Sequence, residues 1–295
     1  MRDHGAMSFV VTADARELRD RAWGFIEPRM ECNVLATVLL RVLDGHYDDV
    51  RPLFGYALDG DGAVTAVAIR TPPLPMMCSE LGPPSADELL DVWLSQDREL
   101  PGASGAPATA RALASGWRAR TGGETRCQRG MAMHALERVT DPPRPPAGRL
   151  RLADRSEREL MIEWWQAFAE EADSPGGRQA AASVDARLGR RALLVWDDGG
   201  GPVSLVALSP PVARVVRIGP VYTPPGRRRR GYAGMAVAEV SRRALVGGAR
   251  ACMLFTDLAN PTSNKIYKEV GYRRFGDWEE HVFALRDGVI PHQSV

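Results

Sequence analysis

The stretch Val221–Gly234, VYTPPGRRRRGYAG, decides the fold. It joins an extended run, 213–223, to residues 232–246, where apolar residues recur at helical spacing. A loop of glycine and arginine that opens a helix brings together free backbone N–H groups, the positive end of the helix dipole and guanidinium charge. The stretch therefore predicts a phosphate site. NTP hydrolysis is excluded, because Tyr232 and Ala233 stand where a nucleotide P-loop has its lysine and hydroxyl residue.

A second segment, 260–271, has the start and stop signals of a complete helix. Asn260 is placed to cap the first turn, Pro261 suits the first helical position, and Gly271 follows the last residue. One face of this helix, its expected inner face, carries Ser263, Ile266, Tyr267 and Val270. A short apolar run, 251–256, precedes the segment and predicts a buried strand.

Together the two segments resemble the GNAT acetyltransferase superfamily. Its pyrophosphate loop, Arg/Gln-x-x-Gly-x-Gly/Ala, is matched by residues 228–233, and its second element by residues 260–267, closed by Gly271-Tyr272. The resemblance covers roughly residues 150–286. It implies an opening between two parallel strands, 213–223 and 251–256, that receives acetyl-CoA as acetyl donor, with a strand bulge at Gly219 and Pro220.

The resemblance also assigns roles to residues of both segments. Tyr267 is the expected catalytic residue, because this position supplies the proton to the departing thiolate in many family members. Asn260 is expected to bind the cofactor or only to cap its helix, and Asn264 to face the cofactor or the solvent. The expected cofactor-binding residues are Val221, Tyr222, Thr223, Arg228, Arg229, Arg230, Gly231, Tyr232, Ala233, Gly234, Asn260, Asn264 and Tyr267.

The general base stays open at this stage. A water chain serves as well as any of the candidate side chains, which are Glu163, Glu170, Glu171, Asp257, Glu280 and His281.

The organisation of the chain is a tandem. Four prolines within residues 142–146 exclude helix and central strand and mark a linker. Two hairpin patterns, 58–69 and 197–208, recur at a constant offset and indicate an internal duplication. The prediction is an α/β fold with a mixed sheet in two GNAT-like domains: residues 1–141 as a degenerate copy, 142–148 as linker, 149–287 as the catalytic domain and 288–295 as a tail.

The second half reads as alternating elements that form a sheet covered by helices. Helices are expected at 154–172, 181–190, 232–246 and 261–270, a hairpin at 192–208, and a closing strand pair at 272–275 and 278–285. The aromatic residues Trp164, Trp165 and Phe168 are expected to fill the core. In the first half, residues 101–107 are the expected counterpart of the arginine loop. They contain no basic residue, so one cofactor site per chain is expected.

Composition bounds the function. The 295 residues are 44% hydrophobic and 25% charged, with a net charge of +1, which disfavours a nucleic-acid binder. Neither an export signal nor a membrane span is recognised, so a cytoplasmic protein, monomer or homodimer, is expected. The four cysteines form no C-x-x-C pair, which predicts buried thiols and no metal.

Two functions follow from these observations. The first is an N-acetyltransferase in which an amine of an unidentified acceptor attacks acetyl-CoA directly. The alternative is a noncatalytic sensor or partner-binding module that binds acyl-CoA, in which Tyr267 only packs.

Overall fold

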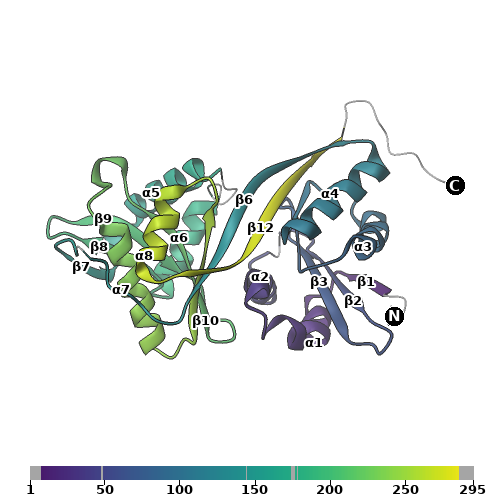
Figure 1. Ribbon diagram of the computed structural model, residues 1–295, viewed down its shortest axis with the longest axis horizontal. Coiled ribbons are helices and arrows are strands. Elements are labelled where there is room, and N and C mark those ends of the chain that lie inside the picture. The colour runs from purple at the N-terminus through teal and green to yellow at the C-terminus, as the bar shows by residue number, and fades with distance from the viewer. Residues whose placement is uncertain (1–7, 48, 144, 174–176, 178, 286–295) are drawn as a thin grey trace. The chain divides into compact units, whose positions relative to one another are not determined.

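The computed structural model describes residues 8–47, 49–143, 145–173, 177 and 179–285, which form two compact units (Figure 1). Within these residues, unit 1 comprises 8–131 and 276–285, and unit 2 comprises 132–275. The predicted tail, 288–295, lies outside the described residues. None of the described helices is both long and apolar enough to cross a bilayer.

The first repeat of secondary structure begins in unit 1. Its helices and strands follow in the order β1 (Ser8–Thr12), α1 (Ala15–Ile26), α2 (Asn33–Leu43), β2 (Leu53–Leu58), β3 (Val64–Arg70), β4 (Met76–Cys78), α3 (Pro83–Gln96), β5 (Gly102–Gly105), α4 (Pro107–Thr121) and β6 (Glu124–Leu136), with a 3₁₀ turn at Met30–Cys32.

The second repeat has the same order of helices and strands. It contains β7 (Arg149–Leu152), α5 (Arg158–Glu171), α6 (Ala180–Gly189), β8 (Leu193–Asp197), β9 (Pro202–Leu208), β10 (Val215–Tyr222), α7 (Tyr232–Val246), β11 (Ala251–Asp257), α8 (Pro261–Val270) and β12 (Arg273–Ala284), with 3₁₀ turns at Arg155–Glu157 and Pro225–Arg227. Both predicted hairpins are present, as β2–β3 and β8–β9. The expected tandem of mixed sheets covered by helices is confirmed.

The last strand of each repeat joins the sheet of the other. β12 pairs with β5 of the first repeat, and β6 neighbours β11 of the second. The strand pair expected at 272–275 and 278–285 is wrong, because residues 273–284 form one continuous strand through Gly276. Residues 276–284 therefore belong to unit 1, although the sequence placed them with the second half. An extended partner strand satisfies their backbone groups without a return turn.

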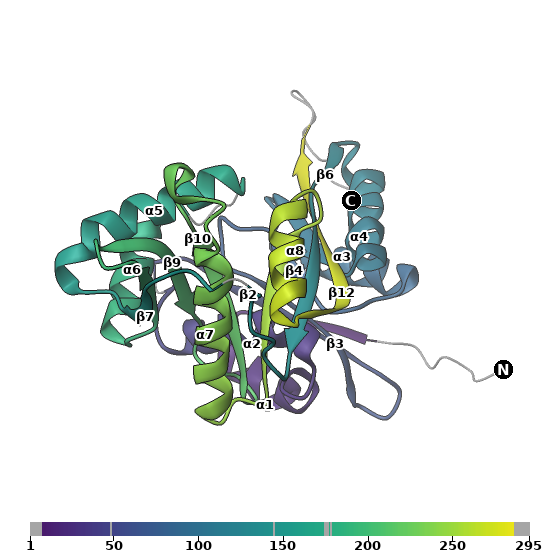
Figure 2. The same ribbon diagram turned by 60° about the vertical axis from the view of Figure 1, so that its left-hand side comes forward.

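The sheet of unit 2 has an apolar core on each face. Leu194 and Trp196 of β8 pack in the cluster that includes α7, whereas Leu193 and Val195 pack in the cluster of α5 and α6. This alternation follows from the two-residue period of a strand. Trp164 and Trp165 are buried as predicted, and α7 and α8 lie side by side on one face (Figure 2).

The cysteines depart from the prediction at one position. Cys32, Cys78 and Cys252 are buried, but Cys127 is exposed on β6. The prediction failed because the polar pattern around Cys127 is that of a half-exposed strand, in which alternate side chains face solvent.

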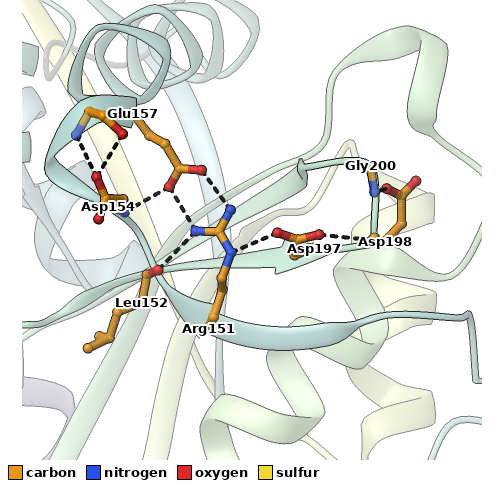
Figure 3. Close-up of polar contacts among 9 residues, drawn as sticks. Arg151, Leu152, Asp154, Glu157, Asp197, Asp198 and Gly200 are labelled. Atoms are coloured by element: carbon orange, nitrogen blue, oxygen red, sulfur yellow. Dashed lines mark hydrogen bonds and ion pairs between the residues drawn. The ribbon is translucent and has the colours of Figure 1, made fainter.

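An arginine holds together the first elements of the second repeat. The Arg151 guanidinium donates to both carboxylate oxygens of Glu157, at 2.9 and 2.6 Å, and to Asp197 Oδ2 at 2.7 Å (Figure 3). These bonds join β7 to β8 and to the 3₁₀ turn that precedes α5. The hydrogen bonds from Arg151 are the main cause that lowers the pKa of both carboxyl groups.

We predict that Arg151→Gln removes a stabilisation that depends on pH. Carboxyl groups with a lowered folded-state pKa stabilise the fold above their unfolded pKa of about 4, and that contribution is lost as the pH falls through the folded value. The difference in unfolding free energy between wild type and variant should therefore be full at neutral pH and shrink below about pH 4. Urea unfolding at several pH values measures it. Arg149→Gln, an exposed change on the same strand, is the control, and a pH-independent difference would contradict the prediction.

Phe283 provides a test of the strand exchange. Its ring stacks on Trp117 of α4, with centroids 4.8 Å apart, and lies in the core of unit 1. Phe283→Ala should lower the unfolding free energy by about 3–5 kcal/mol, because a buried ring leaves a cavity. Phe275→Ala, which truncates a ring that is 40% exposed, should cost much less. Denaturant unfolding followed by tryptophan fluorescence measures both; equal small effects would count against the exchange.

Candidate functional site

The site is built where β10 and β11 separate. Their parallel pairing runs from Val215 and Ala251 to Arg217 and Met253, and among the described residues it goes no further, although the strands continue to Tyr222 and Asp257. Beyond Arg217, the β11-facing edge of β10 has no strand partner in the described part of the chain. The two strands therefore part at the place where the resemblance implies an opening.

A bulge in β10 accompanies this separation. The register with β9 shifts between Ile218 and Val221, where Gly219 and Pro220 lie. Gly219 has a φ of +145°, a region that glycine adopts without steric cost, and Pro220 has no N–H to donate to a ladder. The bulge expected at these two residues is confirmed.

The arginine loop, residues 223–231, leads from β10 into the N-terminus of α7, whose N–H donors have no side-chain cap in the described structure. Gly231 precedes the helix with a φ of +83°, and neither a capping side chain nor an acidic residue occupies the described first turn. The N–H groups of Tyr232, Ala233 and Gly234 precede the first intrahelical bond, which Met235 donates to Gly231. These donors and the helix dipole favour an anion.

The arginines of the loop are not equivalent. Arg228 donates to the Thr223 carbonyl at 2.8 Å and to both oxygens of Glu171 at 2.7 and 2.8 Å, and Arg227 lies 3.7 Å from Asp198.

Arg229 and Arg230, by contrast, are exposed and form no ion pair with the described residues. They are thus the two guanidinium groups next to Gly231 that are available to an anionic ligand, and the structure distinguishes them from Arg228, whose charge is already paired.

Tyr267 lies on the inner face of α8. Its half-buried ring packs on the core of unit 2 and meets the Tyr272 ring edge-on, with centroids 6.0 Å apart. Its hydroxyl has no hydrogen-bond partner among the described residues. Burial raises the pKa of Tyr267 to about 12, so the phenol stays protonated at neutral pH and keeps a proton to donate.

The two asparagines anchor α8. Asn260 accepts from the Ser263 N–H at 3.0 Å, so its capping role is confirmed. Asn264 accepts from Thr256 Oγ1 at 2.5 Å and donates to the Asp257 carbonyl at 3.1 Å. Its amide thus attaches α8 to the end of β11. Cofactor binding by either residue stays a prediction.

Ser204 is a supporting residue that the sequence analysis missed. It is fully buried on β9, donates to the Tyr222 carbonyl at 3.0 Å and lies 2.9 Å from Thr223 Oγ1. It therefore holds the end of β10, where Val221, Tyr222 and Thr223 were expected to bind the cofactor. A single hydroxyl within the apolar run 203–208 was the available signal.

The candidate bases divide between the units. Glu171 is paired with Arg228 beside the Tyr222 hydroxyl, Asp257 accepts from the Ala259 N–H, and Glu163 and Glu170 are exposed on α5. Glu280 and His281 belong to unit 1, where Glu280 pairs with Arg129. Four of the six candidates thus lie in unit 2 and two in unit 1.

The corresponding place in unit 1 is closed. The counterpart of the arginine loop is 79–82, between β4 and α3, and not 101–107, which contains β5. The prediction of 101–107 rested on local composition, whereas the counterpart is identified by the order of helices and strands, which only the fold shows. The segment 79–82 contains no basic residue, and Pro83 and Pro84 remove the N–H groups of the first two helical positions.

Side chains and close backbone contacts fill the rest of that place. Thr109 Oγ1 accepts from the Leu81 N–H at 2.8 Å and donates to the Leu81 carbonyl at 3.1 Å. At Gly105 of β5, an added Cβ would lie 2.8 Å from the Cys78 carbonyl oxygen. The strands of this place thus approach each other too closely to admit a ligand between them.

Comparison with known proteins gives a family match within unit 2. Residues 158–272 match the family model of the acetyltransferase (GNAT) family. A comparison with curated protein sequences gives no significant match.

Solved structures similar to this chain share its fold over nearly the whole length. A Drosophila protein has a TM-score of 0.63 at 15% identity, covering 97% of this chain and 98% of that one. A GCN5-related N-acetyltransferase from Sphaerobacter thermophilus has a TM-score of 0.58 at 18% identity, covering 95% and 97%. A tandem GNAT protein from the clavulanic acid biosynthesis pathway has a TM-score of 0.56 at 14% identity, covering 95% and 98%.

The chain thus has two GNAT folds in tandem, and residues 158–272, within unit 2, match the model of the GNAT acetyltransferase family.

Proposed function

We propose that unit 2 is an N-acetyltransferase that transfers the acetyl group of acetyl-CoA to an amine. The observation that carries the proposal is the opening between β10 and β11 directly beside the uncapped N-terminus of α7. The opening offers an unpaired strand edge to an amide-containing arm, and the helix N-terminus offers N–H donors to a diphosphate. Arg229 and Arg230 add positive charge at the same end.

In the proposed reaction, the amine attacks the thioester carbonyl directly. A C–N bond forms, the C–S bond breaks, the amine loses one proton, and the departing thiolate gains one. Tyr267 supplies the second proton, because its raised pKa keeps the hydroxyl protonated above the range in which thiols ionise. Backbone N–H groups near Val221 are proposed to stabilise the oxyanion.

One acetyl-CoA is proposed to bind per chain. Unit 1 lacks basic residues in its loop 79–82 and the first two helical N–H groups of α3. Its proposed contribution is structural, because its strand β5 pairs with β12, the last strand of the second repeat.

We predict that Tyr267→Phe lowers kcat about 10²- to 10⁴-fold, the usual contribution of a positioned proton donor. The ring remains to pack against Tyr272, so the KM for acetyl-CoA and the unfolding free energy should change little. Release of the CoA thiol is followed with small amines, aminoglycosides, amino acids and peptide N-termini as acceptors. An unchanged kcat would exclude Tyr267 as the acid, whereas acetyl-CoA binding with no turnover in the whole panel would favour the noncatalytic module.

We predict that the double variant Arg229→Ala/Arg230→Ala weakens acetyl-CoA binding at least about tenfold, because it removes charge-assisted bonds worth about 1.5–3 kcal/mol. Isothermal titration measures affinity and stoichiometry together, and one site per chain is expected.

Two single variants serve as matched controls in the same loop. Arg227→Ala and Arg228→Ala remove guanidinium groups that Asp198 and Glu171 already pair, so their effects should be smaller. Equal losses in all variants would point to general attraction, and two sites per chain would refute the closed state of unit 1.

A further inference from the structure

Three side chains with different donor atoms meet on one face of unit 1. Cys127 lies on β6, and Glu279 and His281 lie on β12, two residues apart and therefore on the same side of that strand. One donor atom from each, a sulfur, a carboxylate oxygen and a ring nitrogen, all lie within 4.8 Å of one another. The residues are distant in the sequence, which is why no local metal-binding spacing revealed them.

The geometry is close to that of a tetrahedral metal site. With bonds of about 2.0–2.3 Å, a tetrahedral Zn²⁺ holds its ligand atoms about 3.3–3.6 Å apart. His281 Nε2 and Glu279 Oε2 are 3.0 Å apart in a hydrogen bond, which an ion bound to both atoms would replace. The remaining approach falls to the thiol of Cys127, the exposed member, whose side chain has the most freedom to move.

The surroundings limit the mobility of the other two donors. The side chains of Glu279 and His281 are only 12% and 10% exposed, so the site is preformed on the strand that carries them. Arg111 binds the Glu279 carboxylate in a bidentate pair, Nε to Oε2 at 3.0 Å and a terminal nitrogen to Oε1 at 2.5 Å. The Arg111 side chain is 67% exposed, so water can solvate its guanidinium group when one carboxylate oxygen turns to a cation.

We propose that Cys127, Glu279 and His281 bind one divalent transition-metal ion of the zinc type, with a fourth position open to solvent. A thiolate with an imidazole selects such ions over Mg²⁺ and Ca²⁺, which prefer all-oxygen ligands. Binding releases the thiol proton to solvent. The ion would link β6 to β12, the closing strands of the two repeats, and stabilise unit 1. The proposal is independent of acetyl transfer, and it departs from the sequence expectation of no metal.

Titration of the tag-free, metal-stripped protein with Co²⁺ tests this site. One equivalent should produce a thiolate-to-cobalt charge-transfer band and the visible bands of a tetrahedral ion, and one equivalent of Zn²⁺ should abolish both. Zn²⁺ should also raise the melting temperature, since a ligand of the folded state stabilises it. The absence of a charge-transfer band in the wild-type protein overturns the proposal without recourse to any variant.

Matched variants assign the band to its ligands. Cys127→Ser and His281→Gln should each remove it, with the far-ultraviolet circular dichroism spectrum confirming that the fold persists. Cys252→Ser changes a thiol that is fully buried in unit 2 and should leave the band intact. A band that survives Cys127→Ser, or disappears in Cys252→Ser alone, would place the ion elsewhere and refute the assignment.

Discussion

The separation of β10 from β11 is the constraint on which the rest of unit 2 depends. Backbone groups inside a fold need hydrogen-bond partners, and a strand that leaves its neighbour normally finds another. Here the pairing stops after Arg217 and Met253, and the bulge at Gly219 and Pro220 follows directly along β10. The end of β10 is held in place beside the unpaired edge, because the Ser204 hydroxyl contacts the Tyr222 carbonyl and the Thr223 hydroxyl.

The same architecture gives opposite results in the two units. Both repeats place a helix after the strand equivalent to β10, but α7 begins with free N–H groups whereas α3 begins with two prolines. In unit 1, the Thr109 hydroxyl accepts the hydrogen bond of the Leu81 N–H in the loop, and Gly105 allows β5 to approach β4 closely. The difference lies in a few side chains, so a common fold does not imply a common activity.

The exchange of closing strands makes unit 1 depend on both ends of the chain. β12 pairs with β5, and the Phe283 ring completes the core around Trp117. The exchange of strands also brings together Cys127, Glu279 and His281 from segments far apart in sequence. Local patterns indicate that a segment is a strand, but they carry little information on which strand it pairs with.

The sequence by itself determined most helices of the second half, both hairpins and the tandem organisation, because these depend on local periodicity, caps and turns. The predicted bounds of α7, 232–246, agree with the structure for this reason. The sequence also identified the arginine loop and the helix from Asn260. Only the tertiary structure decided the partners of β6 and β12, the pairing of Arg228 with Glu171, and the true counterpart of the loop in unit 1. The first two are contacts between segments distant in the chain, which packing and charge select in three dimensions, and the third follows from the order of helices and strands in the folded repeat.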